Sequence, residues 1–408
     1  MIKALRSAAI LAMAATLAGC AGTSNPSPRM SATPAQDVAD ARCRGAGIAI
    51  DTAFAAGALD TCSVAADGTV TIVIAPEDAP PINCSPWYAF RVHSDEARTV
   101  PVALTYSACG HRYRPKVSHD GIAWDYLPDD AVEVEETADT TTARLMVQTD
   151  GRPLYVAAQE IVAPATYDAW LDGLQKHPSA RRYTLGGSAE GRPIDAIEIG
   201  NEAAREQVVL VGRQHPPEVT GALAMFPFVE TIAGDSDLAQ RFRARFNVVA
   251  VPLLNPDGVV RGHWRHSTGG VDLNRDWGPF TQPETRLMRD LLARIADDPA
   301  REPVLMLDFH STGHDVFYTI PDELETDPPL FTKLWLERYQ QLMPGYEVNR
   351  DARHVADRPI SKAYVYDQYG IPGVTFEIGD ETDRDLIRRI GQQAAAAMME
   401  TLLATPEE

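Results

Sequence analysis

The segment VVLVGRQHPPEVTGALA, Val208–Ala224, decides the fold of the C-terminal part of the chain. Its apolar start predicts a buried strand, and the apolar residues at helical spacing after Glu218 predict a helix. The loop between them carries His215, two prolines and Glu218. A His and a Glu three residues apart can bind one metal ion. The chain has ten histidines, so one such pair can also arise by chance. The loop therefore predicts a metal site only if further ligands lie near it.

After about residue 160, apolar runs alternate with helical patterns. The predicted strands are VVLVG (208–212), FNVVAVPLL (246–254), PVLMLDFH (303–310) and GVTFEIG (373–379). The predicted helices are TYDAWLDGLQKH (166–177), ALAMFPFVETIAG (222–234), PETRLMRDLLARIAD (283–297) and PPLFTKLWLERYQQLM (328–343). This alternation predicts an α/β domain, residues 161–408, whose sheet has helices on both faces.

Residues 44–160 have a different pattern, which predicts an antiparallel β-sandwich domain. Its short strands are separated by turn residues: TVTIVIAP (69–76), WYAFRVH (87–93), TVPVALTY (99–106), ARLMVQT (143–149) and LYVAAQEI (154–161). Cys43, Cys62, Cys84 and Cys109 lie in this third of the chain. An oxidising compartment would allow two disulfides among them, with three possible pairings.

The N-terminus, MIKALRSAAILAMAATLAGC, predicts export. Two basic residues and an apolar stretch indicate a signal peptide over residues 1–19. The apolar stretch is about 13 residues, too short for a membrane span of about 20. Leu-Ala-Gly-Cys resembles the bacterial lipobox, which implies lipidation of Cys20. Residues 20–43 would then be a flexible tether, and no Asp follows Cys20, which favours an anchor in the outer membrane facing the periplasm.

The chain has 37 Lys and Arg against 57 Asp and Glu, a net charge of -20. Nucleic acid is therefore not expected as a partner, because binding of phosphates needs a basic face.

Charged and metal-binding residues follow each predicted strand of the α/β domain. These residues are His215 and Glu218, then Arg265 and Asp272-Leu273-Asn274-Arg275, then His310, and finally Glu377. Two His and one Glu form a zinc site with an open position for water. A further carboxylate can move protons, a guanidinium can stabilise an oxyanion, and an Arg beside an Asn suits a terminal carboxylate. Together they predict hydrolysis of an amide next to a free carboxylate.

The sequence resembles the zinc carboxypeptidase family, most closely its cytosolic branch, whose members trim C-terminal glutamates. The matching segments are QHPPE, VPLLNPDGVVRGHWRHSTGGVDLNRDW, LDFHST and TFEIGD, within residues 165–400. INCSPWYAFRV and YSACGHRYRPKVSHDGIAWDYLP resemble the β-sandwich that precedes the catalytic domain in that branch. The resemblance implies a mixed sheet, one Zn²⁺ ion and peptide substrates with a free C-terminal carboxylate.

The resemblance also implies a role for each residue of the predicted site. The zinc ligands would be His215, Glu218 and His310; the general base Glu377; the oxyanion arginine Arg265; and the clamp for the terminal carboxylate Asn274 and Arg275. Other interpretations stay open: Arg265 could be a surface charge, Asn274-Arg275 a solvated turn, and Glu377 a buried ion-pair partner. We do not expect His263, His266, His314 or His354 to be ligands.

Two positions depart from the family pattern. Pro217 replaces the usual glycine of His-Pro-Gly-Glu and restricts φ without removing a ligand. Val355 stands where pancreatic-type enzymes have a mobile tyrosine, and neither Tyr364 nor Tyr366 is assigned that role.

Lys362 stands where the family has the residue at the base of its specificity pocket, 15 positions before Glu377. A lysine there favours Asp or Glu as the C-terminal residue by charge pairing. Arg350, Arg353 and Arg358 lie just upstream. In the alternative interpretation Lys362 faces solvent and the arginines pair with surface acids. Two other functions remain open: a zinc amidase acting on peptidoglycan stem peptides or acyl-amino acids, and a binding protein built on an inactive enzyme scaffold.

Overall fold

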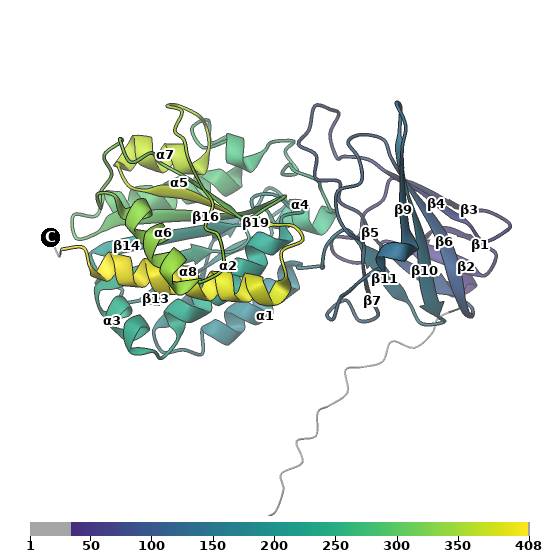
Figure 1. The fold of residues 1–408 in the computed structure, drawn as a ribbon, viewed down its shortest axis with the longest axis horizontal. Helices are drawn as coiled ribbons and strands as arrows, with labels where there is room; N and C mark the ends of the chain where they lie inside the picture. Colours follow the sequence, from purple (N-terminus) through teal and green to yellow (C-terminus); the bar gives the residue numbers. More distant parts are fainter. Residues whose placement is uncertain (1–33, 407–408) are drawn as a thin grey trace, which may run out of the picture.

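The structure is a computed structural model that describes residues 34–406. The predicted signal peptide, the lipobox and Cys20 lie outside the described residues. Two bodies lie side by side, an all-β body formed by the N-terminal part of the chain and an α/β body formed by the rest (Figure 1). No helix within the described range is both long enough and apolar enough to cross a membrane.

The N-terminal body is the predicted β-sandwich. One sheet has the strand order β1 (Ala41–Gly45), β2 (Ile48–Asp51), β5 (Ala89–Ser94), β11 (Leu154–Ala157), β7 (Lys116–Ser118) and β8 (Asp125–Tyr126). The other has the order β3 (Thr61–Val64), β4 (Val70–Ile74), β6 (Ala97–Tyr106), β10 (Thr141–Asp150) and β9 (Val132–Glu136). Strands β6 and β10 pair along ten residues, and their alternating side chains form the core between the sheets.

Two details of this body differ from the prediction. Strands β4 and β6 pair in parallel, because β5 between them crosses to the opposite sheet, so the sandwich is not wholly antiparallel. The predicted tether over residues 20–43 is also too long, because the 3₁₀ turn Ala35–Asp37 and strand β1 already belong to the sandwich. Ala35 and Val38 are buried against Ala49 of β2, which joins this segment to the sandwich.

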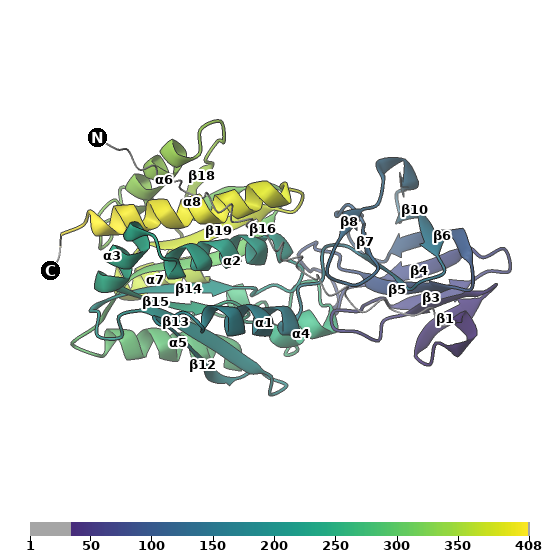
Figure 2. The same ribbon diagram turned by 90° about the horizontal axis from the view of Figure 1, so that it is seen from below.

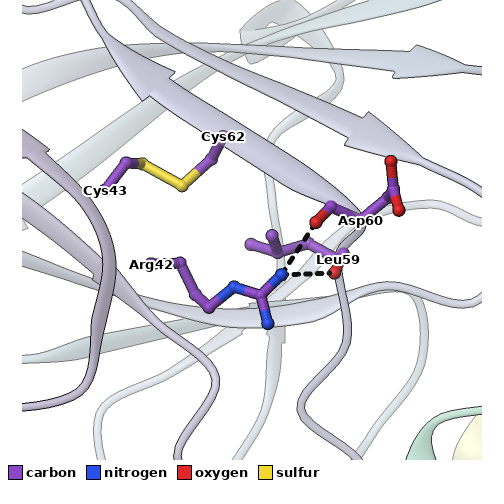
Figure 3. Close-up of a disulfide and its surroundings, with 5 residues drawn as sticks. All are labelled: Arg42, Cys43, Leu59, Asp60 and Cys62. Atoms are coloured by element: carbon purple, nitrogen blue, oxygen red, sulfur yellow. Dashed lines mark hydrogen bonds between the residues drawn. A yellow bond between two sulfur atoms is a disulfide. The ribbon is translucent and has the colours of Figure 1, made fainter.

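The four cysteines of the described residues form two disulfides, Cys43–Cys62 and Cys84–Cys109. The first links β1 to β3, and Arg42 beside it donates to the backbone oxygens of Leu59 and Asp60 (Figure 3). Each bridge therefore closes a short loop of the sandwich.

The C-terminal body confirms the predicted α/β class with a mixed sheet. Its eight strands have the order β12 (Ala180–Gly187), β13 (Pro193–Gly200), β15 (Phe246–Val251), β14 (Glu206–Gly212), β16 (Glu302–Thr312), β19 (Gly373–Gly379), β17 (Val316–Thr319) and β18 (Arg350–Ala352). The four central strands β15, β14, β16 and β19 are parallel, so their carboxyl ends meet at one edge of the sheet.

Helices cover both faces of this sheet (Figure 2). In β14, Val208 and Leu210 point to one face while Val209 and Val211 point to the other, as the period of two requires. The first face packs against α1 (Pro164–Leu174), α2 (Val219–Ala233), α3 (Asp237–Arg245), α6 (Phe331–Leu342) and α8 (Arg384–Leu403). The second packs against α5 (Pro283–Ala296) and α7 (Ser361–Tyr369), and α4 (Pro256–Arg261) lies next to the sandwich.

Candidate metal centre and cleft

The loop after β14 is held in an unusual conformation that presents His215 and Glu218. Arg213, with a φ of 55°, is buried, and its guanidinium donates to the oxygens of Pro216, Val162 and Tyr167. Helix α2 then starts directly after Glu218 and packs closely on β16. A Cβ at Gly221 would lie 2.5 Å from the carbonyl oxygen of His310, so only glycine allows this approach.

The three predicted ligands meet at one point. Nδ1 of His215 lies 2.8 Å from Oε1 of Glu218, and Nδ1 of His310 lies 2.7 Å from Oε2. The two Nδ1 atoms are 3.1 Å apart, and all three side chains are buried. Each side chain thus offers one ligand atom within the span of a single ion, which is the arrangement of a catalytic zinc site.

Carboxylates hold the far nitrogen of both histidines. Nε2 of His215 lies 2.8 Å from Asp272, and Nε2 of His310 lies 2.8 Å from Asp308. Such partners fix the imidazole so that Nδ1 would be available to a metal ion. The sequence analysis named Asp272 without a role and did not single out Asp308, because a supporting acid has no spacing that distinguishes it from a surface acid.

The charges of this cluster favour a cation at its centre. Burial opposes ionisation of Glu218, yet the adjacent imidazoles of His215 and His310 lower its pKa well below the usual value. Burial disfavours protonation of His310, yet Asp308 and Glu218 raise its pKa well above the usual value. Positive charge is therefore stabilised where the ligand atoms converge, and the donor set fits zinc.

Glu377 lies on β19 directly opposite His310 of β16. Burial raises its pKa to about 8, and its Oε2 is buried without a hydrogen-bond partner among the described residues. A carboxylate of this kind is suited to accept a proton, whereas a buried ion-pair partner would be satisfied.

Arg265 is oriented by two acids rather than by solvent. Its Nε donates to Asp272 at 2.8 Å and its Nη1 to Glu218 at 3.3 Å. Asn274 lies 3.3 Å from His310 through Nδ2, and its Oδ1 accepts from the backbone of Ser361. Arg275 donates to the backbone oxygen of Asn274.

All eight predicted site residues line one cleft of about 500 Å³. Lys362 is a buried residue of this lining. Its Nζ donates to the backbone oxygens of Thr319 and Arg353, and burial lowers its pKa to about 8. Tyr318 and His354 also line the cleft, and His354 is paired with Asp367. Tyr364 instead packs against Trp277 and Phe280.

The β-sandwich supports this site across the interface between the two bodies. The carboxylate of Glu77 accepts hydrogen bonds from the backbone N–H groups of Trp264, Arg265 and His266 at 2.7 to 2.9 Å. The imidazole of His266 pairs with Asp78 at 2.7 Å. The segment carrying the predicted oxyanion arginine is therefore held by the other body, which nothing in the sequence indicated.

Comparison with solved structures supports this fold. The chain is similar to a metallo-carboxypeptidase from Burkholderia cenocepacia, with a TM-score of 0.73 and 20% identity over 87% of this chain and 98% of that one. It is also similar to a metallo-carboxypeptidase from Pseudomonas aeruginosa, solved with (2-guanidinoethylmercapto)succinic acid, with a TM-score of 0.69 and 19% identity over 86% of this chain and 98% of that one.

Curated relatives match part of the chain. Cytosolic carboxypeptidase 6 of Caenorhabditis elegans is 27% identical over 42% of this chain and 41% of its own length. Human cytosolic carboxypeptidase 2 is 38% identical over 32% of this chain and 15% of its own length. These matches span less than half of the relatives. The model of the zinc carboxypeptidase family matches residues 167–387, more than half of the chain, and the chain belongs to that family.

Proposed function

We propose that this protein is a zinc-dependent carboxypeptidase that removes the last residue of peptides and prefers Glu or Asp at that position. The observation that carries the acidic preference is the charge of the cleft. Besides Arg112, whose charge is offset by Asp380, its lining includes the cations Arg265, Arg275, Arg353, Arg358 and Lys362 but only two carboxylates, Glu218 and Glu377. A cleft lined by more cations than carboxylates attracts anionic substrates, even though the whole chain has a net charge of -20.

His215, Glu218 and His310 would hold the zinc ion. When bound, zinc polarises the scissile carbonyl and lowers the pKa of water. Glu377 then removes a proton from the attacking water and delivers it to the leaving amine, for which its unpartnered Oε2 is available. Because Glu377 is buried, water competes little with this transfer.

Three other residues of the cleft would bind the oxyanion and the terminal carboxylate of the substrate. Arg265 lies beside the ligand Glu218, where a guanidinium can donate to the oxyanion that forms on the scissile carbonyl. Asn274 and Arg275 are adjacent donors at the lining of the same cleft and suit the free carboxylate of the substrate.

Lys362 is the specificity residue in this proposal. Two of its three N–H donors are bound by backbone oxygens, which leaves one for the side chain of the substrate. The guanidinium of Arg358 lines the same cleft and has no hydrogen-bond or ion-pair partner among residues 34–406. Arg353 instead pairs with Asp351, and Arg350 with Asp322.

The test is a set of peptides that differ only in the last residue: Glu, Asp, Phe, Lys or D-Ala. Release would be followed by mass spectrometry with zinc-loaded protein, chelated protein and protein given zinc again. The proposal expects loss of Glu and Asp that chelation abolishes and zinc restores. Equal release of Phe or Lys would refute the acidic preference, and no release from any peptide would favour amides of the cell wall as substrates.

We also propose that the protein is exported and anchored by lipid on Cys20 in the outer membrane, facing the periplasm, because Ala21 and not Asp follows that cysteine. The lipobox and the two disulfides support an oxidising compartment outside the cytoplasm. Fatty-acid labelling of the wild type and of Cys20→Ser, followed by membrane fractionation, would test this. A Cys20→Ser protein that is still labelled would contradict it.

A further inference from the structure

The β-sandwich contributes one wall of the catalytic cleft. Asn83, Ser85 and Arg112 line the cleft together with the zinc ligands. Asn83 and Ser85 flank Cys84, whose disulfide to Cys109 fixes this part of the sandwich. The two segments that resemble the family's sandwich contain these three residues, but the mechanism described above gives them no role.

Arg112 is held rigidly, with one nitrogen left over. Its Nε donates to Asp380 at 2.8 Å, and its Nη1 donates to the backbone oxygen of Cys84 at 2.7 Å and to the hydroxyl of Ser85 at 2.9 Å. The guanidinium also lies 5.1 Å from the centre of the Tyr113 ring. Within the described part of the chain, Nη2 donates no hydrogen bond. The side chain is 25% exposed, so a ligand in the cleft can reach it.

Strand β19 shows where Arg112 lies relative to the reaction. Lys362 packs at the start of the strand, because a Cβ at Gly373 would touch its backbone oxygen at 2.5 Å. Glu377 lies in the middle, and Asp380, the partner of Arg112, follows the end of the strand. At about 3.3 Å per residue, Asp380 is roughly 10 Å beyond Glu377, in the direction away from Lys362. A peptide whose last side chain faces Lys362 therefore has its upstream residues near Arg112.

We propose that Arg112 is a substrate-binding residue that donates Nη2–H to a main-chain carbonyl oxygen on the N-terminal side of the scissile bond. This inference rests on the proposed function. A carboxylate would be recognised by two guanidinium nitrogens in parallel, and only one is free here. Asp380 also offsets the charge of Arg112. The contact therefore makes catalysis depend on the length of the peptide and not on the identity of its upstream side chains.

The test compares N-acetylated peptides of two to five residues that share the same last two residues, Ala-Glu. For the wild type, kcat/KM should rise with length once a carbonyl reaches Arg112. In Arg112→Met this rise should be lost. For the longest peptide kcat/KM should fall about 10- to 100-fold, mainly through a higher KM, while kcat/KM for the shortest peptide stays unchanged. Arg112→Lys keeps a charge beside Asp380 but has no second nitrogen, and should behave like Arg112→Met.

The matched control is Arg114→Met, because Arg114 lies two residues away and pairs with the exposed Asp129. It should leave the length dependence unchanged. Equal losses of Arg112→Met on short and long peptides, or no loss on either, would overturn the inference while leaving the proposed function intact. If that variant does not fold, wild-type protein can be given the long peptide with single upstream carbonyls replaced by methylene. One replacement should cause the same loss, and an unchanged rate for every replacement would overturn the inference. A wild type that cleaves none of the peptides would refute the proposed function itself.

Discussion

Replacement of Lys362 by Met should remove the preference for an acidic last residue. One N–H of Nζ remains for the substrate, so the structure offers one charge-assisted hydrogen bond. Such a bond contributes about 1.5–3 kcal/mol, which corresponds to about 10- to 150-fold in kcat/KM. Glutamine has the same shape as glutamate without the charge. We therefore expect kcat/KM for a peptide ending in Glu, divided by kcat/KM for the same peptide ending in Gln, to lie in this range for the wild type. For Lys362→Met this Glu/Gln ratio should be close to unity.

The same ratio should change with pH. Burial lowers the pKa of Lys362 to about 8, from an ordinary value of 10.5. The ammonium is charged below that pH, so the preference is complete in neutral solution and is lost as the pH rises through about 8. Because kcat/KM reports the free enzyme, the midpoint belongs to Lys362 before the substrate binds. Taking the ratio of two substrates cancels any pH dependence of the catalytic steps that they share.

The assay is a competition between peptides ending in Glu and in Gln, followed by mass spectrometry from about pH 6.5 to about pH 9.5, a range that brackets this pKa. Lys333→Met, which removes an exposed lysine from α6, is the matched control and should behave as the wild type. Lys362→Asp should favour Lys over Glu as the last residue. An unchanged Glu/Gln ratio in Lys362→Met would refute the role of Lys362 in the pocket.

Three further changes have defined outcomes. Glu77→Ala leaves three backbone N–H groups without their acceptor and frees the segment that carries Arg265. We therefore expect kcat to fall about 10- to 100-fold while the zinc content is retained. An unchanged kcat would contradict this. Replacement of both Cys84 and Cys109 by Ser opens a loop of 25 residues. The free energy of unfolding, measured by urea titration, should fall by about 3 kcal/mol. An unchanged urea midpoint would show that the disulfide does not stabilise the protein. Zinc at about 1,000 times its Kd should stabilise the folded protein by about 4 kcal/mol, so chelation should lower the calorimetric Tm by several degrees; equal Tm values would mean that the site does not bind zinc tightly.

The sequence alone was enough to predict the parts of the fold that depend on local patterns. The apolar runs at β14, β15, β16 and β19 are continuous because both faces of these strands are buried, and such runs stand out from their surroundings. Ligands at the ends of parallel strands follow from the same pattern, since those ends share one edge of the sheet.

Contacts between distant segments could not be predicted in this way. The carboxylate of Glu77 meets the backbone of Arg265 across 188 residues, and Arg112 meets Asp380 across 268. No periodicity or fixed spacing in the sequence marks either contact. Backbone N–H groups exist at nearly every residue and charged side chains are common on any surface, so neither partner stands out. The parallel pairing of β4 with β6 was missed for a related reason, since it depends on which sheet β5 joins.

The carboxylate of Glu77 also limits how this enzyme can be divided or recombined. A catalytic body expressed alone would have three consecutive amides open to water where the segment carrying Arg265 needs a fixed acceptor. A foreign sandwich joined at residue 160 would need an acid in the same place as Glu77 to restore that segment. We therefore expect the catalytic body to need the sandwich for full activity, and a chimera should keep this contact before its linker is chosen.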